Sequence, residues 1–391
     1  MEFAKVYIKS NKQKVIESKS PWIFSGAIER IENYKHDGQP CKIFYQKRFI
    51  GIGYVNKTSD IMVRVFEYND INLNYNYFYK KILNLKKIKE SLISDNTNTY
   101  RLINGEGDFL PGLIVDVYGE YIVFQSHTAG IDFFKDMVIR SLVSIYNPKG
   151  IYEKSDSITR KHEGVDKKSG ALYGNIPEEI EIYENGYKFI VSFNKSQKTG
   201  FFIDQRENRE IFSKYAKDKT ILNAFSYTAA FGVYAYKNGA SKVVNVDTDS
   251  QALEIGKKNY LINNIKINED EFIEEDCKDY LREMPYDYYD LIILDPPKFA
   301  KSRKNIDNAI KGYKYINKMA MQKIKSGGII FTFSCSGVIS LDLFRMIIFY
   351  AAKEAKRNVK ILKRLSASSD HSISVFHKEG EYLKGFILYV E

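Results

Sequence analysis

The C-terminal half of the chain alternates short apolar runs with longer stretches of helical periodicity. The runs at 291–294 and 329–333 contain no polar alternation, which is typical of central parallel strands covered on both faces. Strands that alternate with helices predict a doubly wound parallel sheet, so we expect a Rossmann-like α/β domain from residue 191 onward. The predicted strands are 220–224, 242–247, 272–275, 290–294 and 328–333; the predicted helices are 228–238, 250–263, 277–284, 308–325 and 341–357; runs at 360–365 and 382–390 complete the chain.

The N-terminal half has a different pattern. Residues 1–70 contain short apolar or alternating runs broken by Gly, Pro and Asn, which predict a small β-barrel. Residues 71–190 combine helix signals with two hairpin signals, which predict an α+β domain. We therefore expect three domains, at 1–70, 71–190 and 191–391. The runs in the first region are 6–8, 42–45, 49–54 and 61–65; in the second, helices are predicted at 77–94 and 131–145 and hairpins at 112–125 and 180–191.

Composition narrows the class of protein. The 391 residues are 44% hydrophobic, which is ample for folded cores, and no uncharged apolar run approaches the roughly 18 residues that a membrane helix needs. The N-terminus lacks the apolar segment of a signal peptide. Cys41, Cys277 and Cys335 are too few and too scattered for a disulfide or metal framework, so we expect a cytoplasmic protein without metal.

The charge is unevenly distributed. The net charge of +10 divides into +4 for residues 1–70, −1 for 71–190 and +7 for 191–391. Basic regions of this kind favour a polyanion such as RNA as partner. The abundance of Lys, Asn, Ile and Tyr is also what an AT-rich genome produces, so charge alone leaves the partner open.

Two strand exits carry the candidate chemistry. Asp295-Pro296-Pro297-Lys298-Phe299 follows the run at 291–294, and Ser334-Cys335-Ser336 follows the run at 329–333. In open α/β sheets ligands bind just beyond the carboxyl ends of the strands. These exits therefore predict an active site. The alternative for Cys335 alone is a small buried hydrophobe.

The residues at the ends of the first three strands of the predicted sheet indicate the cofactor. The loop after the first strand, Asn223-Ala224-Phe225-Ser226-Tyr227, is not the glycine-rich loop that a pyrophosphate requires. Asp247 ends the second strand, where an acid binds ribose hydroxyls, and Asp276 ends the third, where it can accept from an adenine amino group. An adenosine without phosphates describes S-adenosylmethionine. Each acid alone could instead cap a helix.

Several stretches make a family resemblance specific, and together they span nearly the whole chain. The sequence resembles the bacterial class I methyltransferases that carry an N-terminal PUA domain and make 5-methylcytosine in large-subunit ribosomal RNA. It departs from the family at Ala229-Ala230, where glycines are usual, and at Ser372, where proline is usual. The matching stretches are 21–27, 51–56, 101–106, 110–116, 197–206, 222–228, 246–248, 294–299 and 334–337.

This resemblance implies roles for the candidate site residues. Cytosine carbon-5 needs activation by a thiolate added at carbon-6, so Cys335 is the expected nucleophile, and Asp295 is expected to face the ring nitrogen beside the amino group. Pro296, Pro297, Lys298 and Phe299 are expected to bind the flipped base. The expected cofactor-binding residues are Thr199, Phe202, Asp204, Arg206, Asn223, Phe225, Tyr227, Asp247, Asp276, Cys277 and Asp295.

Four local expectations remain. The segment 197–206 is predicted to fold over the cofactor mouth, with a domain linker as the alternative. The basic loop Lys298, Lys301, Arg303 and Lys304 is predicted to contact phosphates, unless it is only a solvated charge run. Trp22, the only tryptophan, is assigned to the barrel core in preference to base stacking. Cys277 is expected to be structural.

Other functions stay open at this point. The Asp-Pro-Pro motif also resembles enzymes that methylate amino or ring nitrogens, in which case Cys335 would be incidental and the target a guanine or adenine. A non-catalytic RNA-binding assembly factor is a further alternative, which the intact acids disfavour. A nicotinamide dehydrogenase is disfavoured by the missing phosphate-loop glycines. The sequence also leaves open whether the chain forms a homodimer.

Overall fold

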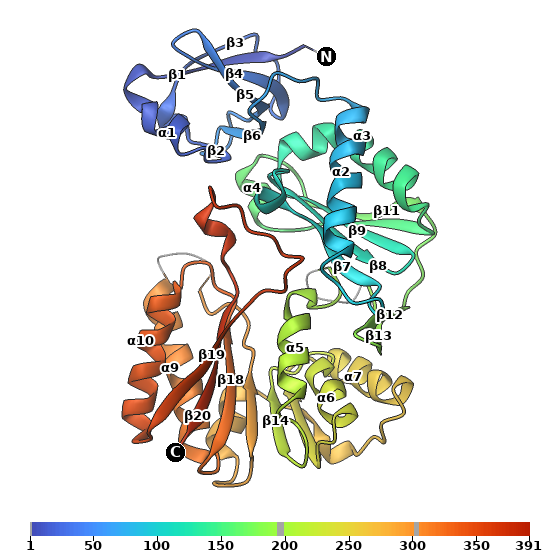
Figure 1. Ribbon diagram of the computed structural model, residues 1–391, viewed down its shortest axis with the longest axis vertical. Helices are drawn as coiled ribbons and strands as arrows, with labels where there is room; N and C mark the ends of the chain where they lie inside the picture. Colours follow the sequence, from blue (N-terminus) through green and yellow to red (C-terminus); the bar gives the residue numbers. More distant parts are fainter. Residues whose placement is uncertain (1, 194–198, 301–304) are drawn as a thin grey trace. The chain divides into compact units, whose positions relative to one another are not determined.

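The computed structural model describes residues 2–193, 199–300 and 305–391, which form two compact units (Figure 1). The first unit comprises Met1–Ile180, Val191–Phe201 and Ser369–Gly380. The second comprises Glu181–Ile190, Phe202–Ser368 and Glu381–Glu391. The three predicted domain ranges stay a prediction. No helix within these described ranges is long and apolar enough to cross a membrane.

The first unit begins with a six-stranded sheet in the order β2-β6-β5-β4-β1-β3. Ile23, Cys41 and Ile43 are among the side chains of its core. Trp22 is only half-buried, because its neighbour Ile23 is the residue that faces inward, so the assignment of Trp22 to the barrel core is wrong. The elements are β1 (Ala4–Ile8), α1 (Gln13–Glu17), β2 (Trp22–Ile23), β3 (Ile28–Glu32), β4 (Gln39–Tyr45), β5 (Arg48–Val55) and β6 (Val63–Glu67).

A second sheet of the first unit has five strands in the order β11-β10-β9-β8-β7. Helices α2 and α3 pack against this sheet, and both predicted helices are confirmed with shifted ends. The predicted hairpin is β8 and β9, with Gly119 at φ +58° in its turn. The elements are α2 (Tyr75–Glu90), β7 (Thr99–Asn104), β8 (Leu113–Tyr118), β9 (Tyr121–Ser126), α3 (Ala129–Tyr146), β10 (Gly150–Ser155), α4 (Thr159–His162) and β11 (Lys168–Gly174).

The second unit is built on a seven-stranded sheet in the order β16-β15-β14-β17-β18-β20-β19. The five predicted strands, β14 to β18, are confirmed and run parallel to one another. The C-terminal strand β20 differs, because it runs antiparallel to β18 and pairs with β19 as a hairpin. The strands are β14 (Thr220–Ala224), β15 (Lys242–Asp247), β16 (Phe272–Glu274), β17 (Leu291–Leu294), β18 (Gly328–Ser334), β19 (Val359–Ser366) and β20 (Lys384–Val390).

Helices cover both faces of this sheet (Figure 1). Ile330 of β18 packs with residues of α9 and α10 in one core, whereas Phe331 packs against Phe212 of α5 on the other face. Helix α6 begins at Ala230, two residues later than predicted, because Ala229 is left-handed at φ +56°. The helices are α5 (Arg206–Ser213), α6 (Ala230–Lys237), α7 (Ser250–Ile262), α8 (Cys277–Glu283), α9 (Ile306–Lys323) and α10 (Leu341–Ala355); the hairpin β12 (Ile180–Glu184) and β13 (Tyr187–Val191) precedes them.

Candidate active site

Five loops of the second unit leave the carboxyl ends of parallel strands and therefore meet at one edge of the sheet. Strand β17 pairs with both β14 and β18, so the loops after these three strands are neighbours. The strand order reverses at β14 and β17, which is where α/β sheets bind their ligands. All five exits carry predicted site residues at or just beyond the strand end: Phe225, Asp247, Asp276, Asp295 and Cys335.

The thiol of Cys335 lies against the Asp-Pro-Pro turn. Its Sγ is 3.7 Å from the carbonyl oxygen of Pro296, and the side chain is half-buried. The next residue reinforces the contact, because the Ser336 hydroxyl donates to the carbonyl of Ala300 at 2.9 Å. The structure thus brings the two predicted strand exits together, with the thiol neither enclosed in the core nor fully in solvent.

Asp295 is held from the side by Gln205. The Gln205 amide donates to Asp295 Oδ2 at 2.9 Å, and Asn208 donates to the Gln205 oxygen at 2.6 Å. Gln205 and Asn208 are each only 2% exposed. A buried amide chain of this kind fixes the orientation of the carboxylate at the mouth of the sheet. Gln205 lies inside the stretch 197–206 that the sequence singled out, but it was not itself predicted.

Asp247 organises the turn after β15 and the loop after β14. Its Oδ2 accepts from the backbone N–H of Tyr227 at 2.8 Å, and its Oδ1 accepts from the N–H of Asp249 at 3.0 Å. The carboxylate is therefore oriented by two backbone donors. Carboxylate oxygens have further lone pairs, so both contacts are compatible with a ligand hydroxyl.

The loop after β14 has an uncommon backbone. Phe225, Tyr227 and Ala229 have φ values of +61°, +49° and +56°, in a region that costs non-glycine residues energy. Clusters of such strain are typical of ligand sites. The predicted departure at Ala229 thus falls where the backbone is left-handed and glycine would be easiest to accommodate.

Asp276 and Cys277 have local roles. Asp276 is the exposed N-cap of α8 and accepts from the N–H of Lys278 at 2.7 Å. Cys277 is buried; its thiol accepts from the N–H of Phe225 at 3.1 Å and lies 3.3 Å from the carbonyl of Val246. Burial raises the pKa of the Cys277 thiol to about 12. Cys277 therefore supports the loop as an uncharged group.

Asn223 is also internal. Its amide donates to Asn245 at 2.9 Å across the pair β14 and β15, and the residue is 1% exposed. The Asn223 amide nitrogen therefore donates to a neighbouring strand inside the sheet. Its predicted contact with the cofactor stays a prediction.

The segment 199–206 divides between the two units. In the first unit, Thr199 shares a hydrogen bond of 2.9 Å with the hydroxyl of Tyr118. In the second, the ring of Phe202 lies edge-on to Tyr227 with centroids 5.1 Å apart. Gln197 and Lys198 lie outside the described residues, and the predicted closure over the cofactor stays a prediction.

Asp204 and Arg206 are buried, at 4% and 2% exposure. Asp204 Oδ2 accepts from the Tyr382 hydroxyl at 2.6 Å, and the Asp204 carbonyl accepts from the N–H of Ser368 at 2.9 Å. Arg206 is the first residue of α5. These contacts connect the segment to the C-terminal part of the chain, which no sequence pattern indicated.

The candidate substrate residues have mixed exposure. Pro296 is buried, Pro297 and Lys298 are exposed, and Phe299 packs its ring 4.7 Å from that of Tyr313 on α9. Pro297 and Lys298 are therefore the most exposed members of the motif, while Asp295 and Phe299 are partly exposed. Of the predicted basic loop, Lys301, Arg303 and Lys304 lie outside the described residues.

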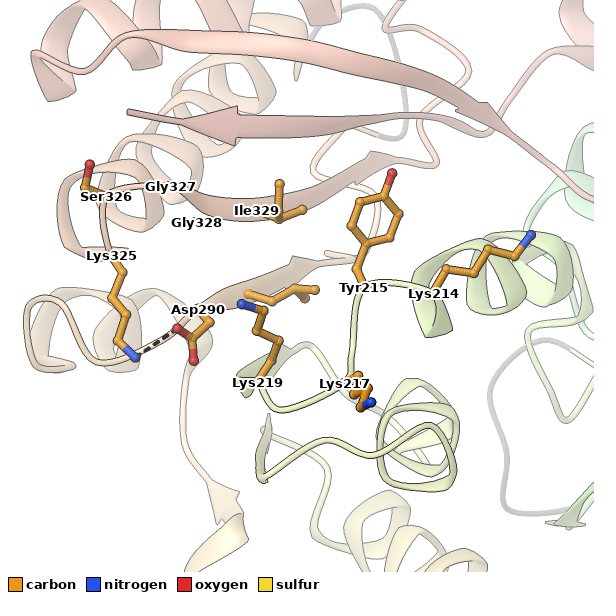
Figure 2. A pocket seen from close by; sticks show the side chains of 11 residues that line it. Lys214, Tyr215, Lys217, Lys219, Asp290, Lys325, Ser326, Gly327, Gly328 and Ile329 are labelled. Carbon is orange, nitrogen blue, oxygen red and sulfur yellow. Dashed lines mark hydrogen bonds and ion pairs between the residues drawn. The ribbon is translucent and has the colours of Figure 1, made fainter.

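A separate pocket of 370 Å³ lies at the opposite edge of the same sheet, where β14, β17 and β18 begin (Figure 2). Lys214, Lys217 and Lys219 line it, together with Lys325, which is 2.9 Å from Asp290. The pocket is basic and contains none of the predicted site residues. Among the residues that the structure describes, no group of three or more His, Cys, Asp or Glu is arranged to hold a metal ion.

Comparison with known proteins shows which cofactor this edge of the sheet binds. The family profile described as S-adenosylmethionine-dependent methyltransferase matches residues 156–372, and a PUA-like domain profile matches residues 6–68. The chain belongs to the S-adenosylmethionine-dependent methyltransferase family. Its cofactor is therefore S-adenosylmethionine, as the acids at successive strand ends predicted.

Relatives match this methyltransferase along its whole length. Ribosomal RNA large subunit methyltransferase I of Aeromonas salmonicida is 38% identical over 389 residues, with 98% of each chain covered. The protein of the same name from Pseudoalteromonas atlantica is 39% identical over 389 residues, with the same coverage. The crystal structure of SMU.776 complexed with SAH matches with a TM-score of 0.84 at 26% identity, covering 99% of this chain and all of that one.

The loop after β14 fits the cofactor of the methyltransferase family. The hydroxyls of Ser226 and Thr228 are buried, and neither has a hydrogen-bond partner among the described residues. Buried polar atoms without partners are costly and are expected to be satisfied by a ligand or water. Beside Asp247, these hydroxyls suit the polar ribose and amino-acid parts of S-adenosylmethionine.

Proposed function

We propose that this methyltransferase makes 5-methylcytosine in large-subunit ribosomal RNA through a covalent adduct of Cys335. The observation that carries the proposal is the 3.7 Å contact between the Cys335 thiol and the Pro296 carbonyl, directly beside Asp295. A methyltransferase that modifies a nitrogen has no use for a thiol at this position. The names of the relatives support ribosomal RNA as the substrate.

Cys335 starts the proposed reaction. Its thiolate adds to carbon-6 of the cytosine, and the ring electrons move toward carbon-5 and the ring nitrogen. Asp295, oriented by Gln205, faces that nitrogen and holds the proton that offsets the charge developing on the ring. S-adenosylmethionine supplies an electrophilic methyl group, which the activated carbon-5 accepts.

The product is released when the bond between carbon-6 and the Cys335 sulfur breaks. A base takes the proton from carbon-5, and the electron pair of that C–H bond restores the ring double bond. The bond between carbon-6 and Cys335 breaks, and its electrons return to the sulfur as thiolate. The enzyme is then unchanged, and one hydrogen of the cytosine has been replaced by a methyl group.

The cofactor is assigned to the loops after β14, β15 and β16. We assign the ribose hydroxyls to Asp247 and the adenine amino group to Asp276, with Phe225 and Tyr227 contributing the loop backbone. The oriented Asp247 carboxylate supports the first of these contacts, and the exposure of Asp276 supports the second. The remaining predicted cofactor residues, Thr199, Phe202, Asp204, Arg206, Asn223 and Cys277, are proposed on the resemblance.

The RNA is assigned to the basic parts of the chain. Lys298 is exposed one residue beyond Pro-Pro and suits a phosphate beside the flipped base. The PUA-like region carries half-exposed Trp22 and exposed Phe24, which together line a pocket of 360 Å³ with Lys12. Aromatic and basic groups in one pocket suit an unpaired nucleotide. We retain the division into domains at 1–70, 71–190 and 191–391, and a cytoplasmic location, as parts of this proposal.

A second candidate is methylation of a guanine or adenine nitrogen. The Asp-Pro-Pro turn favours it, because this motif alone, with Asp295 partly exposed, can orient an amino group by hydrogen bonds. In this case Cys335 would be dispensable.

Analysis of the product decides between the two candidates. Purified enzyme is incubated with S-adenosylmethionine and unmethylated large-subunit ribosomal RNA, and the digested nucleosides are separated by mass spectrometry. We expect 5-methylcytidine as the new nucleoside. A methylated guanosine or adenosine in its place would contradict the proposal.

A further inference from the structure

Lys384 is a buried cation directly behind the Cys335 loop. It lies at the start of β20, where its Cα is the register partner of Ser334, the last residue of β18. The residue is 6% exposed. Cys335 follows Ser334 in the chain, so the lysine and the thiol come from adjacent positions of two paired strands.

Within the described residues, the ammonium of Lys384 donates to two neutral backbone groups. Nζ donates to the carbonyl of Ser336 at 2.8 Å and to that of Ile339 at 2.6 Å. Among the described residues it forms no ion pair with a carboxylate. A buried cation without a counter-ion is costly, and anionic groups close to it lower that cost.

The charged and titratable groups around this pair come from several elements. Burial lowers the pKa of Lys384 to about 8, while Cys335 and Glu381 raise it and Lys298 lowers it further. The pKa of Tyr313 on α9 is raised mainly by burial, and the charges of Cys335 and Asp295 raise it further. Attraction between Lys384 and a Cys335 thiolate is reciprocal, so a thiolate that favours the charged lysine is itself favoured by it.

We propose that Lys384 is a positioning residue that stabilises the thiolate of Cys335, with its charge, and fixes the loop that carries the thiol, with its two hydrogen bonds. This inference rests on the proposed role of Cys335 as nucleophile. It supplies the activation that a free thiol lacks near neutral pH, where only a small fraction is ionised. Because Nζ donates to the carbonyls of Ser336 and Ile339, Lys384 is assigned to positioning and not to the reaction itself.

The test measures the reactivity of Cys335 toward iodoacetamide as a function of pH, in the full-length enzyme without RNA. Alkylation is followed on the peptide that contains Cys335 by mass spectrometry. Cys41 and Cys277 are buried and serve as unreactive internal references. In Lys384→Gln, which keeps an N–H donor but no charge, the pH midpoint of alkylation should rise by roughly one unit. Lys384→Arg should stay near the wild-type midpoint.

Lys323 provides a matched control. It is 7% exposed and also donates to two backbone carbonyls, those of Arg282 and Met284. Burial likewise lowers the pKa of Lys323. Lys323→Gln and Lys384→Gln should therefore both cost stability in a thermal melt, but Lys323→Gln should leave the alkylation midpoint of Cys335 unchanged.

The two proposals fail in different ways. An unchanged midpoint in folded Lys384→Gln would overturn the role of its charge, even if Cys335→Ser is inactive. Conversely, full methylation by Cys335→Ser would overturn the covalent mechanism, even if the midpoint shifts. A shift in both Lys384→Gln and Lys323→Gln would also contradict the inference, because it would indicate a general loosening of the fold.

Discussion

Cys277 and Cys335 occupy comparable places in the same sheet but contrasting environments. Each follows a parallel strand at the carboxyl edge, Cys277 after β16 and Cys335 after β18. The Cys277 thiol is buried among backbone groups, and its pKa is raised to about 12. The Cys335 thiol is half-buried beside Asp295, and Lys384 lies behind its loop.

The contrast shows that position at the end of a strand does not make a thiol a nucleophile. Burial, helped by nearby carboxylates, keeps Cys277 protonated and makes it a packing residue. Partial exposure and a nearby cation are the conditions under which a thiol ionises and reaches a substrate. The following predictions change one environment and leave the other intact.

The largest expected effect is that of Cys335→Ser. We expect a loss of methylation of at least about 10³-fold, because a hydroxyl is far less ionised than a thiol near neutral pH. Binding of S-adenosylmethionine, measured by calorimetry, should be retained. If Cys335→Ser methylates at near the wild-type rate, Cys335 is not the nucleophile and does not differ from Cys277 in function.

Asp247→Ala should have the next largest effect, on the cofactor rather than on the thiol. Loss of hydrogen bonds to a charged acceptor costs about 1.5–3 kcal/mol each, so affinity for S-adenosylmethionine should fall at least about tenfold. Calorimetry measures this directly. Asp276→Ala should weaken binding less, since Asp276 is the exposed cap of α8. Unchanged affinity in Asp247→Ala would count against the assignment of the ribose.

Gln205→Ala removes the amide that orients Asp295. The hydrogen bond to the carboxylate is worth about 1.5–3 kcal/mol, so kcat should fall roughly tenfold or more with little change in the KM for the cofactor. Ser213→Ala, on the same helix as Asn208 but exposed, is the control. A change confined to the KM for the cofactor would place Gln205 in cofactor binding instead.

The smallest effect is expected for Cys277→Ser. Serine can keep the contacts with Phe225 and Val246, but burying a hydroxyl in place of a thiol should cost about 1 kcal/mol of stability. Methylation should be retained. Chemical denaturation measures the loss of stability, and single-turnover methylation measures the retained activity. A loss of activity as large as that of Cys335→Ser would contradict a structural role.

The strand and helix pattern of the second unit could be predicted because its central strands are continuous apolar runs. Continuous burial on both faces also predicted that Asp295 and Cys335 would meet at one edge. The antiparallel direction of β20 could not be predicted in this way, because a buried strand has the same apolar pattern in either direction.

The residues that contact the site residues were harder to predict, because the contacts join parts of the chain that are far apart in the sequence. Gln205, Tyr382 and Lys384 act through contacts with residues far away in the chain, such as Asp295 and Asp204. Lys384 is the first residue of β20, two positions after Tyr382, and only strand pairing places it behind Cys335. The prediction for Trp22 was wrong in the opposite direction: its apolar ring suggested the core, whereas Trp22 is only half-buried and its Nε1 donates to Glu106 at 2.8 Å.

The most direct test of the central claim is covalent trapping with RNA that carries 5-fluorocytosine at the target. Fluorine cannot leave as a proton does, so the adduct should persist after methyl transfer. We predict a protein–RNA band on a denaturing gel that requires both S-adenosylmethionine and Cys335 and that survives Cys277→Ser. Absence of the band from an enzyme that methylates the unmodified RNA, or its persistence in Cys335→Ser, would contradict the account.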